Sequence, residues 1–354
     1  MTAAMIGSFG LAVPPARRQT DLWDGYFAGY YEDNKVAKRL FQKVEVDTRH
    51  EVIDPQVEDV SGWGTGARME RFVNEATPLG KEAVSAALDA AGVAANEVGL
   101  FVVASCTGYA TPGLNILLAR DLGMRPDLRS LLIGHMGCHA ALPGLGVVTD
   151  YVTVQQRPAL LLCVELTSLH LQPAEPLPHP LTSDNIQQMV VHALFGDAAA
   201  AVVMTPKSAA GSLEVVEVTS LSDITTTDMM TWDVTDYGFR MGLSSLVPDV
   251  LARHVGPAVD DLLSSHGLSR SDVEGWAVHP GGPRILESVG EALGLSAEAV
   301  EPSRAVLREY GNCSSATVLL ILERVRKQVA AGGYIVALAF GPGLTLYTTL
   351  LRVR

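Results

Sequence analysis

Apolar and polar positions along the chain predict buried strands separated by amphipathic helices. Residues 17–74 contain polar, amphipathic stretches, and residues 81–93 have the alanine-rich spacing of a helix that closes at Gly92. Residues 100–105 form a short apolar run, typical of a strand buried on both faces. Similar runs occur at residues 159–164, 275–278 and 334–340, and each leads into a loop that bears polar residues or glycine.

This succession predicts a layered α/β fold made of two similar halves. Residues 194–204 contain a tight turn followed by a strand, and the connection at residues 205–212 is rich in small and polar residues. Beyond it, the alternation of strands and helices begins again. We therefore expect an N-terminal half at residues 1–208 and a C-terminal half at residues 209–354, alike in pattern rather than in identity.

The composition indicates a metabolic enzyme rather than a nucleic-acid-binding protein. Hydrophobic residues make up 48% of the 354 positions, and the formal net charge is -13. Binding to nucleic acid requires clustered basic residues that displace counterions from phosphates, so this charge argues against such a partner. One local basic group remains, which suits either a solvated helix face or contact with a phosphate: Lys35, Lys38, Arg39, Lys43 and Arg49.

We expect a cytoplasmic protein that is independent of membranes. No window reaches the roughly 18 apolar residues of a membrane span, and the N-terminal segment lacks the pattern of a secretory signal. The cysteines at 106, 138, 163 and 313 are widely spaced, without a CxxC pair. This spacing predicts neither a disulfide framework nor a zinc site, and reduced thiols suit the cytoplasm.

Cys138 is the candidate nucleophile. It lies in the glycine-flanked segment IGHMGCHAA (133–141), directly before an apolar stretch with the spacing of a buried helix. A cysteine attacks as the thiolate, which a helix N-terminus or a nearby imidazolium stabilises. The alternative interpretation is a buried, inert thiol, since free cysteines are among the most buried residues.

His279 and Asn312 are candidate partners of that cysteine. His279 ends an apolar run directly before Pro-Gly-Gly, where an imidazole can face a cleft. Asn312 lies in a Gly-Asn turn before a long apolar helix, and its amide can donate to an oxygen that develops negative charge. Taken singly, each also fits a structural role, as a hydrogen-bonded core histidine or a helix cap.

Metal and nucleotide sites are not predicted. His135 and His139 stand four positions apart, but the nearby glycines and proline disfavour a continuous helix, and an acidic third ligand is absent from this segment. The Gly-Pro-Gly at residues 341–343 lacks the lysine and the glycine spacing of phosphate loops.

Taken together, the motifs resemble the type III polyketide synthases, the chalcone synthase-like branch of the thiolase fold, from about residue 40 to the C-terminus. The segments that carry this resemblance, in order, are GHMGCHAA (134–141), ALFGDAAAA (193–201), WAVHPGGPRIL (276–286), LREYGNCSSATVLLIL (307–322) and AFGPGLTLYTTLLR (339–352). The resemblance implies a five-layered αβαβα fold and a homodimer.

The resemblance also implies a mechanism. Cys138 would accept an acyl group from a coenzyme A thioester, with His279 holding it as thiolate. His279 and Asn312 would bind the thioester carbonyl of malonyl-CoA and stabilise the enolate left by decarboxylation. That enolate attacks the acyl group, and repeated extension precedes cyclisation to an aromatic or pyrone product. Coenzyme A thioesters are substrates, and neither a metal nor a permanently bound cofactor is required.

The resemblance assigns further residues by position. Phe195 matches the aromatic gatekeeper between the coenzyme A tunnel and the reaction chamber, while Arg39 and Lys43 fall where the family binds coenzyme A phosphates. Cys106 lies in a segment like that of bacterial members such as the tetrahydroxynaphthalene synthases. His170 and Trp232 are bulky where plant enzymes have small residues. The residues expected at the cavity are Cys106, Thr167, His170, Trp232 and Met241.

Two other functions remain open. A ketoacyl-carrier-protein synthase III-like condensing enzyme also uses Cys, His and Asn, but it typically has a His-x-Ala-Asn context where this chain has HPGGP. A carrier protein would then deliver the extender unit. An inactive assembly subunit of the same fold would typically lose one of the three residues, all of which are present.

Overall fold

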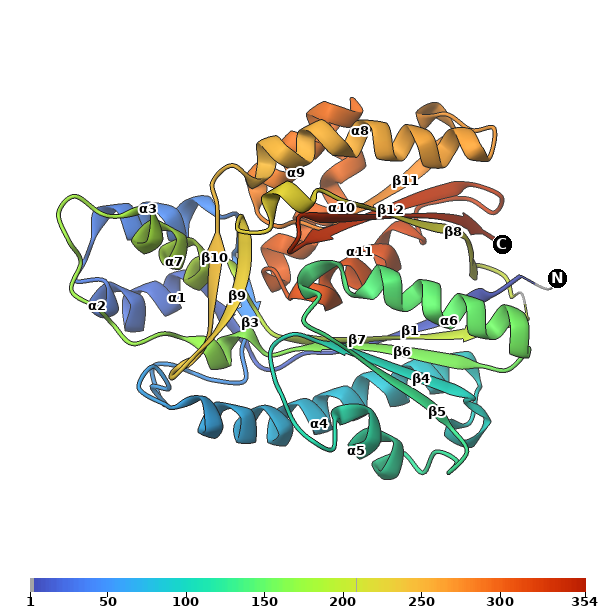
Figure 1. Ribbon diagram of the computed structural model, residues 1–354, viewed down its shortest axis with the longest axis horizontal. Coiled ribbons are helices and arrows are strands. Elements are labelled where there is room, and N and C mark those ends of the chain that lie inside the picture. Colours follow the sequence, from blue (N-terminus) through green and yellow to red (C-terminus); the bar gives the residue numbers. More distant parts are fainter. Residues whose placement is uncertain (1–2, 208) are drawn as a thin grey trace.

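The computed structural model describes residues 3–207 and 209–354, and within them the strands form a mixed nine-stranded sheet (Figure 1). From one edge to the other the order is β11 (Val273–Val278), β12 (Tyr334–Gly341), β13 (Thr345–Val353), β8 (Leu213–Ser222), β1 (Met5–Ala12), β7 (Ala198–Thr205), β6 (Ala159–Glu165), β4 (Leu100–Ser105) and β5 (Arg129–Gly134). The apolar runs expected to be strands lie in β4, β6, β11 and β12, which confirms that prediction.

The sheet divides into two groups of strands. β4 runs parallel to β5 and β6, β11 runs parallel to β12, and the other neighbouring strands are antiparallel. In the described residues, β1 and β8 pair at Met5 with Glu214 and at Ile6 with Leu213, and nowhere else. Figure 1 shows the two groups as separate layers. The expected boundary at residue 208 lies outside the described residues, and the division into residues 1–208 and 209–354 stays a prediction.

Helices cover and separate these two groups. α4 (Thr65–Ala91) and α5 (Leu114–Asp121) cover the outer face of one group, and α8 (Val247–Ser265) and α9 (Pro283–Leu293) cover the other (Figure 1). α6 (Ala141–Gln155) and α11 (Thr317–Val325) lie between the groups, and α10 (Ala297–Tyr310) packs beside β11 and α11. This is the expected layered α/β architecture.

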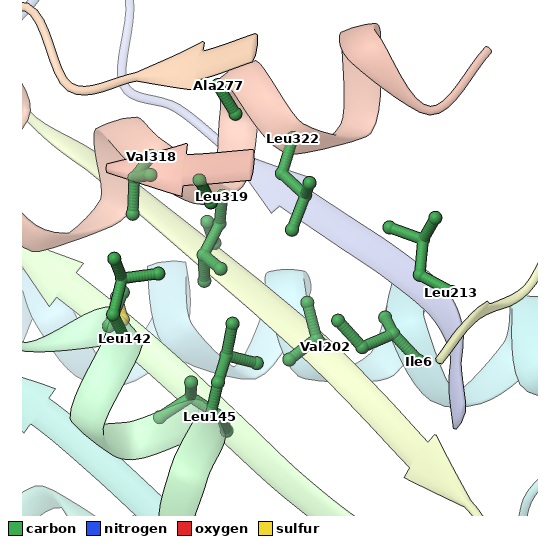
Figure 2. Packing of buried hydrophobic residues seen from close by; sticks show 14 of the residues in the cluster. Ile6, Leu142, Leu145, Val202, Leu213, Ala277, Val318, Leu319 and Leu322 are labelled. Carbon is green, nitrogen blue, oxygen red and sulfur yellow. The ribbon is translucent and has the colours of Figure 1, made fainter. Parts of the chain in front are cut away.

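The middle layer is apolar and closely packed. Figure 2 shows Leu142 and Leu145 of α6 directed toward Val318 and Leu319 of α11, with Val202 of β7 beside them. Each of these side chains is at least 99% buried. Close packing of this kind fixes the position of one helix relative to the other. It therefore also positions the short segments that lead into α6 and α11.

Smaller elements surround one end of the strands. The helical segments are α1 (Gln19–Leu22), η1 (Trp23–Phe27), α2 (Ala28–Tyr30), α3 (Lys35–Lys43) and α7 (Ser183–Leu194); the strand pairs are β2 (Ala16–Arg18) with β3 (Thr48–His50) and β9 (Met230–Thr235) with β10 (Gly238–Leu243). The short helical turns are η2 (Ala95–Glu97), η3 (Gly137–His139), η4 (Thr167–His170), η5 (Ile224–Thr226), η6 (Arg270–Asp272) and η7 (Ser314–Ala316). β10 packs against α7 and η4.

α4 approaches β1 closely because a glycine faces it. A Cβ at Gly10 would overlap the backbone oxygen of Ala83 and would lie 2.5 Å from the backbone nitrogen of Ala87. The hydroxyl of Ser8 donates to the carbonyl oxygen of Ala87 at 2.6 Å. The helix ends as expected at Gly92, whose positive φ of 61° suits glycine. It begins at residue 65, well before the predicted residue 81.

Candidate active site

Cys138 lies in the sharp turn between β5 and α6. His135 and Gly137 have positive φ values of 62° and 70°, which bend the backbone out of the strand and into η3. A Cβ at position 137 would lie 2.8 Å from Cδ of Pro342, so a glycine is needed here. The cysteine is thus held in the short turn that leads directly into α6, as the sequence predicts.

His279 follows β11 and is completely buried. Its backbone nitrogen donates to the carbonyl oxygen of Leu338 at 2.8 Å, which extends the β11–β12 pairing by one residue. The ring meets that of Phe340 edge to face, with centroids 5.6 Å apart. In the described residues, neither ring nitrogen has a hydrogen-bond partner. The imidazole is therefore held by packing, with both nitrogens left for other groups.

Asn312 lies between α10 and α11, beside Phe195. Its backbone nitrogen donates to Leu194 at 2.8 Å, and its carbonyl oxygen accepts from Gly196 at 3.1 Å. These bonds bracket Phe195, which pairs with Asn312 as an isolated parallel bridge. Gly311 has φ of 69°, and a Cβ there would lie 2.8 Å from the carbonyl oxygen of Leu194. The backbone thereby ties the predicted gatekeeper to the predicted amide donor.

The structure packs the Cys138 turn against the segment that follows Asn312. Burial raises the pKa of the Cys138 thiol to about 11, and hydrogen bonds from the side chains of Ser314 and Asn312 partly oppose this increase. η3 packs against both η7 and β12, so the nucleophile lies between the Asn312 loop and the strand beside His279. Burial lowers the pKa of His279 to about 3, with a smaller contribution from the charge of His139.

Sequence reasoning did not assign a role to Glu165, which organises the space behind the nucleophile. This fully buried carboxylate accepts hydrogen bonds from the backbone nitrogen of Cys106 at 3.0 Å, from Thr107 Oγ1 at 2.8 Å and from Ser315 Oγ at 2.5 Å. Burial raises its pKa. Its place at the end of an apolar strand, like that of His279, was the signal available in the sequence.

A cavity opens beside Cys138. The residues that line it are Cys106, Thr107, Gly137, Cys138, Thr167, Phe195, Met230, Thr231, Trp232, Met241, Ser314 and Pro342. Most of the residues expected at the cavity are among them. Trp232 Nε1 donates to the carbonyl oxygen of Cys106 at 2.7 Å, which fixes the indole across the cavity wall.

A second cavity shares Thr167, Phe195, Trp232 and Met241 with the first. His170, also expected at the pocket, lines this second cavity instead. Its Nε2 lies 2.7 Å from the carbonyl oxygen of Thr107, and its Nδ1 accepts from the backbone nitrogen of Phe239 at 2.9 Å. Both nitrogens are thus engaged, and burial lowers the pKa of this histidine to about 4.

The predicted basic group is divided by the fold. Arg39 and Lys43 are exposed on α3 and line neither cavity. Arg49 does not belong with them, because it is 98% buried and forms an ion pair with Glu51. This corrects the sequence-based grouping. Arg49 is the middle residue of β3 and points inward, which the charge pattern alone does not reveal.

Other classes of site find little support in the described part of the chain. Its His, Cys, Asp and Glu side chains form no cluster of three or more suited to a metal ion. Its helices include none both long and apolar enough to cross a membrane. All four cysteines are free thiols and buried.

Comparisons with known proteins give one consistent result. The family model for chalcone and stilbene synthases, N-terminal domain, matches residues 2–207, and the model for the C-terminal domain matches residues 220–354. Over 329 residues the chain is 34% identical to the alpha-pyrone synthesis polyketide synthase-like protein Pks18 of Mycobacterium tuberculosis, covering 89% of this chain and 81% of that protein.

Two further relatives extend this result. Over 328 residues the chain is 36% identical to the 1,3,6,8-tetrahydroxynaphthalene synthase of Streptomyces peucetius subsp. caesius, covering 90% of this chain and 84% of that enzyme. Among solved structures, the C-terminal type III polyketide synthase domain of Steely1 from Dictyostelium superposes with a TM-score of 0.90 at 26% identity, covering 99% of each chain. The fold and the sequence thus point to the same group of proteins.

Proposed function

This chain belongs to the chalcone and stilbene synthase family, and on that premise we propose that Cys138, His279 and Asn312 are its catalytic residues. The protein is a type III polyketide synthase, an acyltransferase that builds polyketides from coenzyme A thioesters. The observation that best supports the assignment is the packing of the Cys138 turn against η7 and β12, in a buried site that opens to a cavity.

The first step loads the nucleophile. His279 takes the thiol proton when the acyl-CoA thioester binds, and the Cys138 sulfur attacks the thioester carbonyl. The C–S bond to coenzyme A breaks, and the proton passes from His279 to the departing sulfur. Burial disfavours the charged form of each group, so the thiolate and the imidazolium stabilise each other when the pair forms.

The second step extends the chain. Malonyl-CoA loses carbon dioxide, and the electron pair of the broken bond forms an enolate whose oxygen accepts hydrogen bonds from His279 and Asn312. The enolate carbon attacks the acyl carbonyl on Cys138 and releases the cysteine sulfur. The product is a β-ketoacyl-CoA longer by two carbon atoms, which reloads Cys138 for further rounds before it cyclises to an aromatic or pyrone product.

The remaining site residues act on binding. Phe195 separates the coenzyme A entrance from the reaction chamber, and its bridge to Asn312 supports this role. The walls formed by Cys106, Thr167, His170, Trp232 and Met241 limit the size and shape of the acyl group. Arg39 and Lys43 on the exposed face of α3 contact the phosphates of coenzyme A.

The enzyme acts as a homodimer in the cytoplasm. The exposed apolar edge of β5 supports the dimer, and the four free thiols suit a reducing compartment. Free malonyl-CoA, rather than a malonyl-carrier protein, delivers the extender unit. The match to chalcone and stilbene synthases favours this over the condensing enzymes that depend on a carrier protein.

Mass spectrometry of the loaded enzyme tests the nucleophile. After incubation with an acyl-CoA, the peptide that contains Cys138 is expected to carry the acyl mass, and C138A is expected to carry none. C163A is the matched control, since it removes a buried thiol outside the cavity and keeps the adduct. An adduct on Cys106, Cys163 or Cys313 in the parent enzyme would refute the assignment.

Release of carbon dioxide from malonyl-CoA tests the other two residues. H279A and N312A are each expected to slow decarboxylation about 10²–10³-fold, the usual cost of losing one donor to a developing oxyanion. H266A, which changes an exposed histidine on the far side of α8, serves as the control and is expected to keep the parental rate. Parental rates in both H279A and N312A would place the enolate elsewhere.

A further inference from the structure

The second cavity borders the cavity beside Cys138. The four residues common to both linings place the two cavities side by side. Most of the second lining is apolar or aromatic, including Phe27, Ile53 and Phe239. An acyl group on Cys138 that is too long for the first cavity has this space as its nearest extension.

Several polar side chains interrupt that apolar lining, and three of them have unpaired atoms. Arg49, Glu51 and His192 border the second cavity and are 2%, 6% and 8% exposed. Among the described residues, Arg49 Nη2, Glu51 Oε2 and His192 Nε2 are all buried without a hydrogen-bond partner. Unpaired polar atoms at such burial are costly and rare, so three in one cavity indicate that something else satisfies them.

The same side chains are fixed from behind. Arg49 Nη1 donates to the carbonyl oxygens of His192 and, at 3.2 Å, of Phe195, while Arg49 Nε lies 3.2 Å from Glu51 Oε1. The hydroxyl of Tyr31 lies 2.6 Å from His192 Nδ1. Because one end of each group is held in this way, the three free atoms keep a defined arrangement.

We propose that the second cavity receives the distal end of the acyl group on Cys138, and that Arg49, Glu51 and His192 select acyl groups whose distal end carries a hydroxyl or carbonyl oxygen. Arg49 Nη2 is a donor, and a ligand oxygen accepts from it. A hydroxyl can in addition donate to Glu51 Oε2. A methyl end does neither and leaves all three atoms unsatisfied, which is the usual basis for rejecting an analogue that lacks the oxygen.

This inference rests on the proposed function, in which Cys138 carries the acyl group. Its test compares straight-chain acyl-CoA starters of about six to twelve carbon atoms, in pairs that end in a methyl or a hydroxyl group. At one or more lengths, kcat/KM is expected to favour the hydroxyl end by about 10-fold or more, the effect of one hydrogen bond to a charged group.

Substitution at Glu51 tests the cause of that preference. In E51L the ratio of kcat/KM for the hydroxyl-ended starter to that for the methyl-ended starter is expected to fall to about one third of the parental value or less, because the acceptor is lost. In E51Q it is expected to remain closer to the parental value, since glutamine keeps the shape and an acceptor oxygen. E45Q is the matched control, because Glu45 pairs with Arg304 on the surface and lines neither cavity. A ratio of two rate constants does not depend on how much of a variant is folded.

The oxygen in the second cavity can belong to the starter or to the growing polyketide chain. Reactions with malonyl-CoA alone distinguish these two sources. If the carbonyl groups of the growing chain occupy the cavity, E51L shortens the products made without an added starter, and the inference holds for that chain. If the parent enzyme treats both starters alike at every length and E51L leaves product length unchanged, solvent satisfies the three side chains and the inference is wrong. Absence of any adduct on Cys138 would refute the proposed function instead.

Discussion

Glu51 carries a charge that costs the fold stability. Burial raises the pKa of its carboxyl to about 7, and the attraction of Arg49 only partly offsets this. Between about pH 4.5 and pH 7 the unfolded chain therefore loses a proton that the folded chain retains. The unfolded state binds fewer protons over this range, so the free energy of unfolding falls as pH rises, and the loss is complete above pH 7.

E51Q is expected to remove this pH-dependent fall in the free energy of unfolding. At pH 8 its free energy of unfolding should exceed that of the parent by about 3 kcal/mol, and the difference should shrink toward zero near pH 4.5. Urea denaturation at several pH values measures it. E45Q, which breaks a partly exposed ion pair with Arg304, should stay within about 1 kcal/mol of the parent. A parent more stable than E51Q at pH 8 would show that the ion pair outweighs the burial cost.

The same residues show how far single positions can be interpreted from sequence. Cys138, His279 and Asn312 stood out because each lies in a turn with glycine or proline next to a predicted strand or helix, where side chains leave the regular backbone. Their roles stay predictions. The burial of Arg49 and Glu51 was not predicted, because a charged residue in a polar segment is expected to be solvated. Long-range packing decides that burial, and local pattern does not contain it.

At the scale of elements, the contact between α4 and β1 depends on one missing side chain. G10A is expected to lower the free energy of unfolding by about 2–3 kcal/mol, since its methyl group overlaps the backbone at Ala83 and the helix must shift. Chemical denaturation measures the change. G7A on the same strand is the control, because its methyl group would have its nearest neighbour, Val203 O, at 3.8 Å, and we expect a loss below about 1 kcal/mol. Equal losses would show that glycine acts here through the unfolded chain.

Strands were easier to predict than helix boundaries for a physical reason. Continuous apolar runs such as residues 100–105 are buried on both faces, so their composition alone marks them. α4 extends 16 residues earlier than predicted because its first turns bury only single residues, such as Arg68 and Phe72, and the polar residues between them obscure the period. The hairpin of β9 and β10 has exposed residues on β9 and half-buried ones on β10, and it gave no clear signal in the sequence.

At the scale of the whole molecule, β5 is an edge strand that exposes apolar side chains. Leu131 and Leu132 are 41% and 44% exposed at the end of the sheet. Proteins usually blunt or cover such an edge, because it can pair with another chain. We propose that a second copy of the chain covers it in the homodimer.

L132E is expected to shift the protein from dimer to monomer, because the carboxylate would be buried without a partner at that contact. Sedimentation velocity at micromolar concentration measures the change. V57E introduces the same charge at a residue that is 83% exposed in a loop elsewhere, and it is expected to remain dimeric. A parent enzyme that sediments as a monomer would contradict the proposal directly.

The narrow junction between β1 and β8 affects how the enzyme responds to mutation. Cys138 belongs to one strand group and His279 to the other, and backbone pairing joins those groups at one corner. Their alignment therefore depends on the packing of α6 against α11, together with the contacts of η3 with η7 and β12. Shortening a side chain such as Leu319 would then slow turnover from a distance, although every residue that contacts the substrate is unchanged.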